Sequence, residues 1–152
     1  MDSIEIIQES DLGRDLTQEE VAKLAAVAVE KECSDGELII KEGDTTRDVF
    51  LIVDGWVSVE IQQYSSELSV PKLQLLKNRG IVGEFSFVDG SRRSANVKAK
   101  DKVWLLMLPY EEMENVLKSE PRMGYIVMRN IAVQLCSRIR NANTELSNQL
   151  IW

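Results

Sequence analysis

The chain has 152 residues, enough to bury a hydrophobic core, and its 44% hydrophobic and 28% charged content is ordinary for a globular protein. The 25 acidic and 18 basic residues give a net charge of −7, which disfavours direct binding to nucleic acid. The sequence has no histidine, which excludes the commonest general base and a histidine metal site. No apolar run approaches the roughly 20 residues that cross a bilayer, and the first residues form no signal peptide. We therefore expect a cytoplasmic protein that does not bind membranes.

Cysteine usage and the lack of a catalytic constellation narrow the function classes further. Cys33 and Cys136 lie far apart in the sequence, and their spacing predicts neither a metal cluster nor a disulfide framework. We also find no pairing of a nucleophile with a general base. We therefore expect no catalytic residues and no bound metal or cofactor, and we interpret the protein as a binding or interaction module rather than an enzyme.

The first helix is predicted to begin at Thr17. Residues 1–16 are polar and mixed, with three isoleucines that could dock on a core. The run T-Q-E-E at 17–20 has the spacing of a capping box between Thr17 and Glu20. Apolar residues then recur at helical spacing up to Ala28, so we expect this helix to pack one face against a sheet.

Short apolar runs separated by turn residues extend from about residue 29 to residue 108 and predict a jelly-roll-like barrel. In the middle of this region, Asp54-Gly55 lies between two such runs and is typical of a hairpin turn. The expected strands are 38–40, 49–53, 56–61 and 73–76, with a polar loop at 63–72 and two closing strands, 95–99 and 103–108, joined by 100–102.

The candidate binding site lies at residues 81–97, which read I-V-G-E-F-S-F-V-D-G-S-R-R-S-A-N-V. Gly83 lets the backbone approach a ligand, and N–H groups at the start of a helical turn can hold an anion. Arg93 adds a planar cation that suits phosphate, and Ser94 adds a donor. Glu84 would repel an anion unless it faces a hydroxyl donor, because an ionised carboxylate only accepts. The segment therefore indicates a nucleotide, unless Glu84 and Arg93 form a solvated surface ion pair.

Residues 83–95, G-E-F-S-F-V-D-G-S-R-R-S-A, resemble the phosphate-binding cassette of the cyclic nucleotide-binding domain superfamily. This superfamily includes catabolite-activator-type regulators and regulatory subunits of cyclic-AMP-dependent kinase. The runs at 36–44 and 50–59 resemble it as well. The resemblance implies a mainly β fold with flanking helices, namely a double-stranded β-helix (jelly-roll) barrel over about 29–108. It also implies a sensor of a 3′,5′-cyclic nucleotide, with cyclic AMP favoured over cyclic GMP.

The resemblance also implies roles for individual residues of this segment. Glu84 corresponds to the carboxylate that binds the ribose 2′-hydroxyl, and Arg93 to the arginine that neutralises the cyclic phosphate. Arg92 departs from the pattern, because many members have proline at that position. The remaining candidate ligand-binding residues of the segment are Gly83, Phe85, Ser86, Ser94 and Ala95.

Two helices are predicted after the barrel, over about 109–151. Pro109 predicts the start of a short helix that ends near Lys118, before Pro121. A second helix over 122–150 would be roughly 43 Å long, more than a small barrel covers. We expect its outer half to form a parallel homodimer, the alternative being one helix lying on its own barrel. Its apolar seam, which repeats at heptad spacing, consists of Tyr125, Met128, Ala132, Leu135, Ile139, Ala142, Leu146 and Gln149.

The stretch S-R-I-R-N-A-N-T-E-L at 137–146 contains the candidate base contacts. In catabolite-activator-type regulators, polar residues of the corresponding helix reach the purine, which implies this role for Arg138, Asn143 and Thr144. For Asn143 and Thr144, a solvated helix surface is the alternative. We expect binding to be transmitted to this helix.

The sequence predicts a single domain over 1–152, with no DNA-binding domain and an unknown effector protein or domain. Two other functions stay open. One is a dimeric interaction or scaffold domain that needs no nucleotide. The other is the ligand-sensing fragment of a transcription regulator that lacks its helix-turn-helix half.

Overall fold

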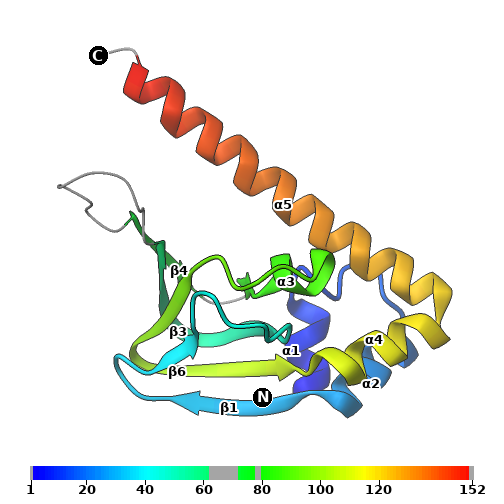
Figure 1. The fold of residues 1–152 in the computed structure, drawn as a ribbon. Coiled ribbons are helices and arrows are strands. Elements are labelled where there is room, and N and C mark those ends of the chain that lie inside the picture. Colours follow the sequence, from blue (N-terminus) through cyan, green and yellow to red (C-terminus); the bar gives the residue numbers. More distant parts are fainter. Residues whose placement is uncertain (1, 62–71, 78–79, 151–152) are drawn as a thin grey trace.

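The computed structural model describes residues 2–61, 72–77 and 80–150 (Figure 1). An antiparallel sheet has the strand order β1-β6-β3-β4, with β2 also paired to β6 and β5 to β3. The predicted fold class is confirmed, although the ladder of the described strands does not close on itself. The strands are β1 (Val29–Cys33), β2 (Leu38–Ile40), β3 (Val49–Ile61), β4 (Lys72–Lys77), β5 (Ile81–Val82) and β6 (Asn96–Leu108). The helices are α1 (Ser3–Glu9), α2 (Gln18–Val27), α3 (Glu84–Asp89), α4 (Tyr110–Ser119) and α5 (Pro121–Leu150).

Two turns predicted from the sequence lie inside the long strands β3 and β6. The predicted hairpin at Asp54-Gly55 was wrong, because β3 continues through these residues and only its register with β6 shifts on both sides of Asp54. The break expected at 100–102 was wrong as well, because β6 is one strand in which Asp101 has a φ of 59°. Asp and Gly tolerate positive φ in a bulge as readily as in a turn, so their presence did not separate the two cases. Most of the loop predicted at 63–72 lies outside the described residues.

Gly55 of β3 lies against the backbone of β6. Its φ is 94°, and a Cβ there would lie 2.7 Å from the Lys102 carbonyl oxygen. We expect Gly55→Ala to lower the free energy of unfolding by about 1–3 kcal/mol, measured by urea denaturation. Gly36→Ala is the matched control, because Gly36 has a φ of 76° but a Cβ there would meet no atom within 4 Å. Equal losses in both variants would contradict a role for the carbonyl contact.

Helices α1, α2 and α4 and the start of α5 cover the end of the sheet that lies away from the β3–β4 tip (Figure 1). The predicted capping box is confirmed, since Thr17 and Glu20 each bond the other's backbone N–H. The sequence pattern missed α1, which Asp2 caps and which buries only Ile7. A shared core joins these helices to β3 and β6, with buried contributions from Ile7, Leu24, Leu51, Leu106, Met113 and Val127.

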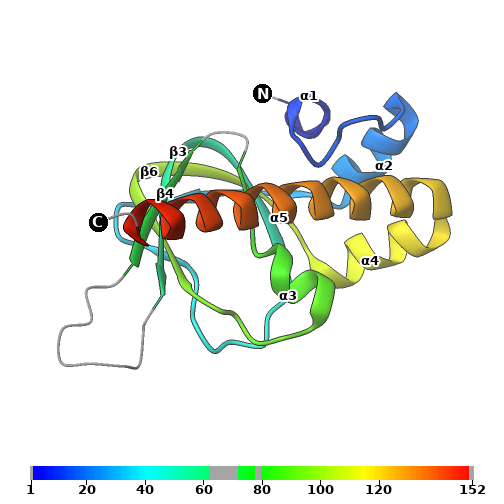
Figure 2. The same ribbon diagram turned by 90° about the horizontal axis from the view of Figure 1, so that it is seen from above.

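Helix α5 leaves this core and runs across the sheet (Figures 1 and 2). Its first half buries one face, which includes Met123, Val127 and Ile131. The predicted heptad seam does not face one way, since Tyr125 is 68% exposed and Leu146 is 56% exposed. Its middle positions Leu135, Ile139 and Ala142 instead face a cavity between α5 and the sheet. The side chain of Gln149, the last seam position, lies outside the described residues. Within the described residues, no helix has the combined length and hydropathy of a membrane-spanning segment.

Candidate functional site

A cavity of about 460 Å³ lies between α5, the segment 83–95 and the inner face of the sheet. Eight of the ten predicted site residues line it, and the other two do not. The eight are Gly83, Glu84, Phe85, Ser86, Arg93, Ser94, Ala95 and Arg138. The cavity therefore brings together residues that are adjacent in the motif and one residue from the distant helix.

Gly83 decides how the segment folds. It lies between β5 and α3 with a φ of 88°, and a Cβ there would be 2.6 Å from the Asp48 carbonyl oxygen and 2.8 Å from Arg93 Nη1. A side chain at this position would therefore displace the arginine. The glycine and the arginine of the motif are thus parts of one packing arrangement.

Arg93 is a buried cation held by uncharged acceptors. It is only 4% exposed. Its Nε donates to Thr46 Oγ1 at 3.1 Å, Nη1 to the Gly83 carbonyl at 2.9 Å, and Nη2 to the Asp48 carbonyl at 2.8 Å. Burial lowers the pKa of the guanidinium, which nevertheless stays charged at neutral pH. A guanidinium has five N–H donors, so these three bonds leave donors for a ligand.

Glu84 is the acidic counterpart on the same cavity wall and is 2% exposed. Arg138 from α5 donates to its carboxylate through Nη1 and to the Ile81 carbonyl through Nη2, the latter at 2.5 Å. Burial raises the pKa of Glu84, while the charge of Arg138 opposes that rise. The ion pair joins α5 directly to the segment on the cavity wall. Glu84 and Arg93 therefore do not form a solvated surface ion pair with each other.

The raised pKa of Glu84 has a consequence for stability. A carboxyl group whose pKa is raised on folding adds stability at low pH, and this contribution is lost as the pH rises through the raised pKa. We expect the free energy of unfolding of the wild type, relative to Glu84→Gln, to fall as the pH rises above the ordinary value of 4.5. Urea denaturation at several pH values measures this difference. A difference that does not change with pH would contradict the expectation.

Part of the cavity wall is apolar and includes Val59, Ile61, Ile139 and Ala142. Such a lining suits the flat face of an aromatic base. Val59 and Ile61 were not identified from the sequence as cavity residues. Their spacing was the available signal, because side chains two positions apart lie on the same face of a strand.

Asn143 and Thr144, the other predicted base contacts, are exposed on α5 and do not line the cavity. The Thr144 hydroxyl donates to the Arg140 carbonyl of its own helix at 3.0 Å. Within one chain, the structure therefore does not bring these two residues to the site, and their role stays a prediction.

A second hollow, of about 510 Å³, lies between α5 and the segment that joins α1 to α2. Four charged side chains on its walls are paired with one another, and a fifth, Arg138, is paired with Glu84. Arg14 contacts Asp11 at 2.6 Å, and Arg129 contacts Asp15 at 2.5 Å. The cavity at segment 83–95 is the better candidate, because its Arg93 guanidinium has no such carboxylate bond among the described residues.

The fold is a β-roll whose cavity is lined by a buried guanidinium, a buried carboxylate and apolar side chains. Residues 30–120 match the family of the cyclic nucleotide-binding domain. This chain belongs to that family, and the resemblance noted in the motif is confirmed.

Two solved structures share this fold, and one curated protein is similar in sequence. The catabolite activator protein of Thermus thermophilus is 27% identical with a TM-score of 0.75, over 91% of this chain and 62% of that one. A cyclic nucleotide-binding domain from Methylobacillus flagellatus KT is 23% identical with a TM-score of 0.83, over 97% and 82%. Glutaminase 2 of Bradyrhizobium diazoefficiens is 26% identical over 138 residues, which are 91% of this chain. The chain spans only 21% of the length of that relative.

Proposed function

We propose that the protein is a non-catalytic regulatory domain that binds a 3′,5′-cyclic nucleotide, with cyclic AMP preferred, in the cavity at segment 83–95. The observation that carries this proposal is the Arg93 guanidinium on the cavity wall, 4% exposed, with uncharged acceptors for its described hydrogen bonds. A buried cation without a bonded anion is a favourable place for one. Membership of the family supports the same ligand class.

In the proposed arrangement the three parts of the ligand meet three different surfaces. The cyclic phosphate lies at Arg93 and Ser94, where the guanidinium retains free donors. The ribose 2′-hydroxyl donates to Glu84. The base fills the apolar part of the cavity beside Ile61 and Ile139, which supports a preference for adenine, because guanine carries more polar edge groups into this lining.

The base preference is measurable. An unsatisfied buried polar group costs about 1–3 kcal/mol, so cyclic GMP should bind about 5- to 150-fold more weakly than cyclic AMP. Calorimetric titration of each nucleotide into the wild type gives the ratio. Tighter binding of cyclic GMP would contradict an apolar base site.

Ligand binding would act on α5 through Arg138. The ribose and this arginine compete for the Glu84 carboxylate, so the bound and free states differ in the contact that joins α5 to the segment. A ligand shifts such an equilibrium only by its unequal contacts in the two states. We therefore expect cyclic AMP to change the position of α5 relative to the barrel.

The proposal also includes a parallel homodimer through α5, supported by the seam residues that are exposed and do not line the cavity, namely Tyr125, Met128 and Leu146. The single-domain organisation over 1–152, the absence of a DNA-binding domain and of nucleic-acid binding, and the cytoplasmic location stay predictions. The effector is unknown.

A thermal-shift experiment tests the function. Cyclic AMP at 100 times its dissociation constant should stabilise the protein by about 2.7 kcal/mol and raise its Tm accordingly. Arg93→Ala serves as the variant that should not respond. If neither cyclic AMP nor cyclic GMP raises the Tm of the wild type at millimolar concentration, the proposal is overturned in favour of a nucleotide-independent interaction domain.

A further inference from the structure

We propose that Arg47, which does not line the cavity, is a positioning residue that couples the ligand-binding segment to helix α4. The inference rests on the proposed function, because the coupling it describes is driven by ligand binding. Arg47 lies just before β3, in a stretch without regular structure, and its side chain reaches both α3 and α4.

On the α3 side, Arg47 holds the last carbonyls of the helix. Its Nε donates to the Ser86 carbonyl at 2.8 Å and its Nη2 to the Phe87 carbonyl at 2.8 Å. The Gly90 N–H shares the Ser86 carbonyl at 3.0 Å. The final carbonyls of a helix have no partner within it, so an arginine from elsewhere fixes this end in place. The opposite end of the same short helix carries Glu84.

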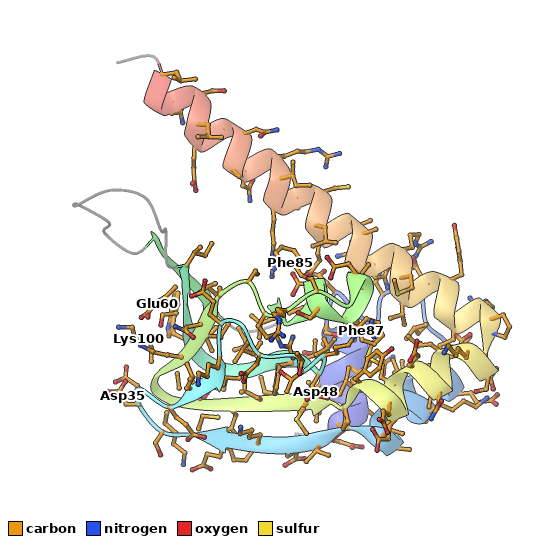
Figure 3. The ribbon with its side chains drawn as sticks, viewed as in Figure 1. Asp35, Asp48, Glu60, Phe85, Phe87 and Lys100 are labelled. Atoms are coloured by element: carbon orange, nitrogen blue, oxygen red, sulfur yellow. The ribbon has the colours of Figure 1, made fainter. Side chains whose placement is uncertain are left out.

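On the α4 side, Arg47 contacts Tyr110, the first residue of that helix. Its Nη1 donates to the Tyr110 hydroxyl at 2.7 Å, and the guanidinium carbon lies 4.0 Å from the centroid of the tyrosine ring. Phe87 packs against the same ring with an edge contact, at a centroid distance of 5.8 Å. In Figure 3, Phe85 lies close to α5, whereas Phe87 lies nearer to α4. One aromatic ring thus receives contacts from Arg47 and from the segment.

Asp48, the residue after Arg47, connects the contact between Arg47 and Tyr110 to Arg93. The Asp48 carboxylate accepts the Tyr110 N–H at 2.8 Å, and its backbone carbonyl accepts Arg93 Nη2 at 2.8 Å. Arg47 and Asp48 therefore connect Arg93, α3 and the start of α4 through consecutive residues. Because α4 leads directly into α5, a shift of the segment on binding would move α4 through this junction.

Hydrogen exchange with and without cyclic AMP tests this role. In the wild type, saturating cyclic AMP should slow exchange both in residues 84–90 and in α4. In Arg47→Met, cyclic AMP should bind about two- to thirtyfold more weakly. At saturation, the protection of 84–90 should persist while that of α4 is lost. Arg47→Lys keeps the charge and part of the hydrogen bonding, so it should restore part of the α4 protection. If Arg47→Met unfolds, Arg47→Lys takes its place in the experiment.

Two controls separate positioning from simple loss of structure. Tyr110→Phe keeps the ring and removes only the hydroxyl, so it should weaken α4 protection without abolishing binding. Arg92→Met removes an exposed arginine of the same segment and should leave both readouts unchanged. Full α4 protection in saturated Arg47→Met would overturn the inference while leaving the proposed function intact. If the wild type does not bind cyclic nucleotides, the proposed function fails and the coupling role fails with it.

Discussion

Arg93→Ala should nearly abolish the binding of cyclic AMP. Removing one partner of a buried charge interaction costs about 2–5 kcal/mol, which corresponds to roughly thirty- to several-thousand-fold in affinity. The structural reason is that Arg93 is the buried cation of the cavity, and the nearby positive charge of Arg138 is already paired with Glu84. Calorimetric titration of cyclic AMP into the variant measures the loss.

The matched control for this experiment is the adjacent arginine. Arg92 is exposed and donates to the Gly43 carbonyl at 2.9 Å, so Arg92→Ala should bind nearly as the wild type does. Arg93 also supports the fold through its bonds to backbone carbonyls, so the Tm of each variant must be recorded. Arg93→Lys keeps the charge and should retain part of the affinity if the variant is folded. Equal losses in the Arg92 and Arg93 variants would show that the wrong arginine has been chosen.

Leu146→Glu should convert the proposed dimer into monomers. Leu146 lies on the heptad seam, is 56% exposed in the single chain and does not line the cavity. In a parallel dimer the two copies would bury two carboxylates against each other. An unsatisfied buried group costs about 1–3 kcal/mol, so the dissociation constant should rise by about 30- to 25,000-fold for two copies. Sedimentation equilibrium over a range of protein concentrations measures this constant.

Ser147→Glu is the control for the dimer experiment. It adds the same charge one residue further along an exposed part of α5, outside the seam. It should leave the dimer intact. A wild type that is monomeric at all concentrations would contradict the homodimer, and so would equal dissociation in both variants.

The local part of the site could be predicted because its chemistry lies within one short segment. Glu84 and Arg93 are nine residues apart, and both line the cavity. The partner of Glu84 could not be predicted from spacing, because Arg138 lies on a helix that reaches the site only after folding. Arg138 entered the prediction through resemblance alone, and then as a base contact rather than as a carboxylate partner.

The fold class was predictable, but the lengths of the strands were not. Short apolar runs identified parts of β3 and β6, whereas Asp54-Gly55 and Asp101 suggested turns where the chain only bulges. Whether such residues end a strand depends on the neighbouring strand, which local sequence does not contain. Arg47 carried no recognisable pattern either, because its importance arises from reaching α3 and α4 at once.

The central claim is that one buried guanidinium and one buried carboxylate bind the two polar parts of the same nucleotide. A crystal structure of the protein with cyclic AMP tests it most directly. We expect phosphate oxygens within hydrogen-bond distance of Arg93, the ribose 2′-hydroxyl on Glu84, and the base against Ile61 and Ile139. A ligand bound elsewhere, or an empty cavity in crystals grown with saturating cyclic AMP, would contradict the claim.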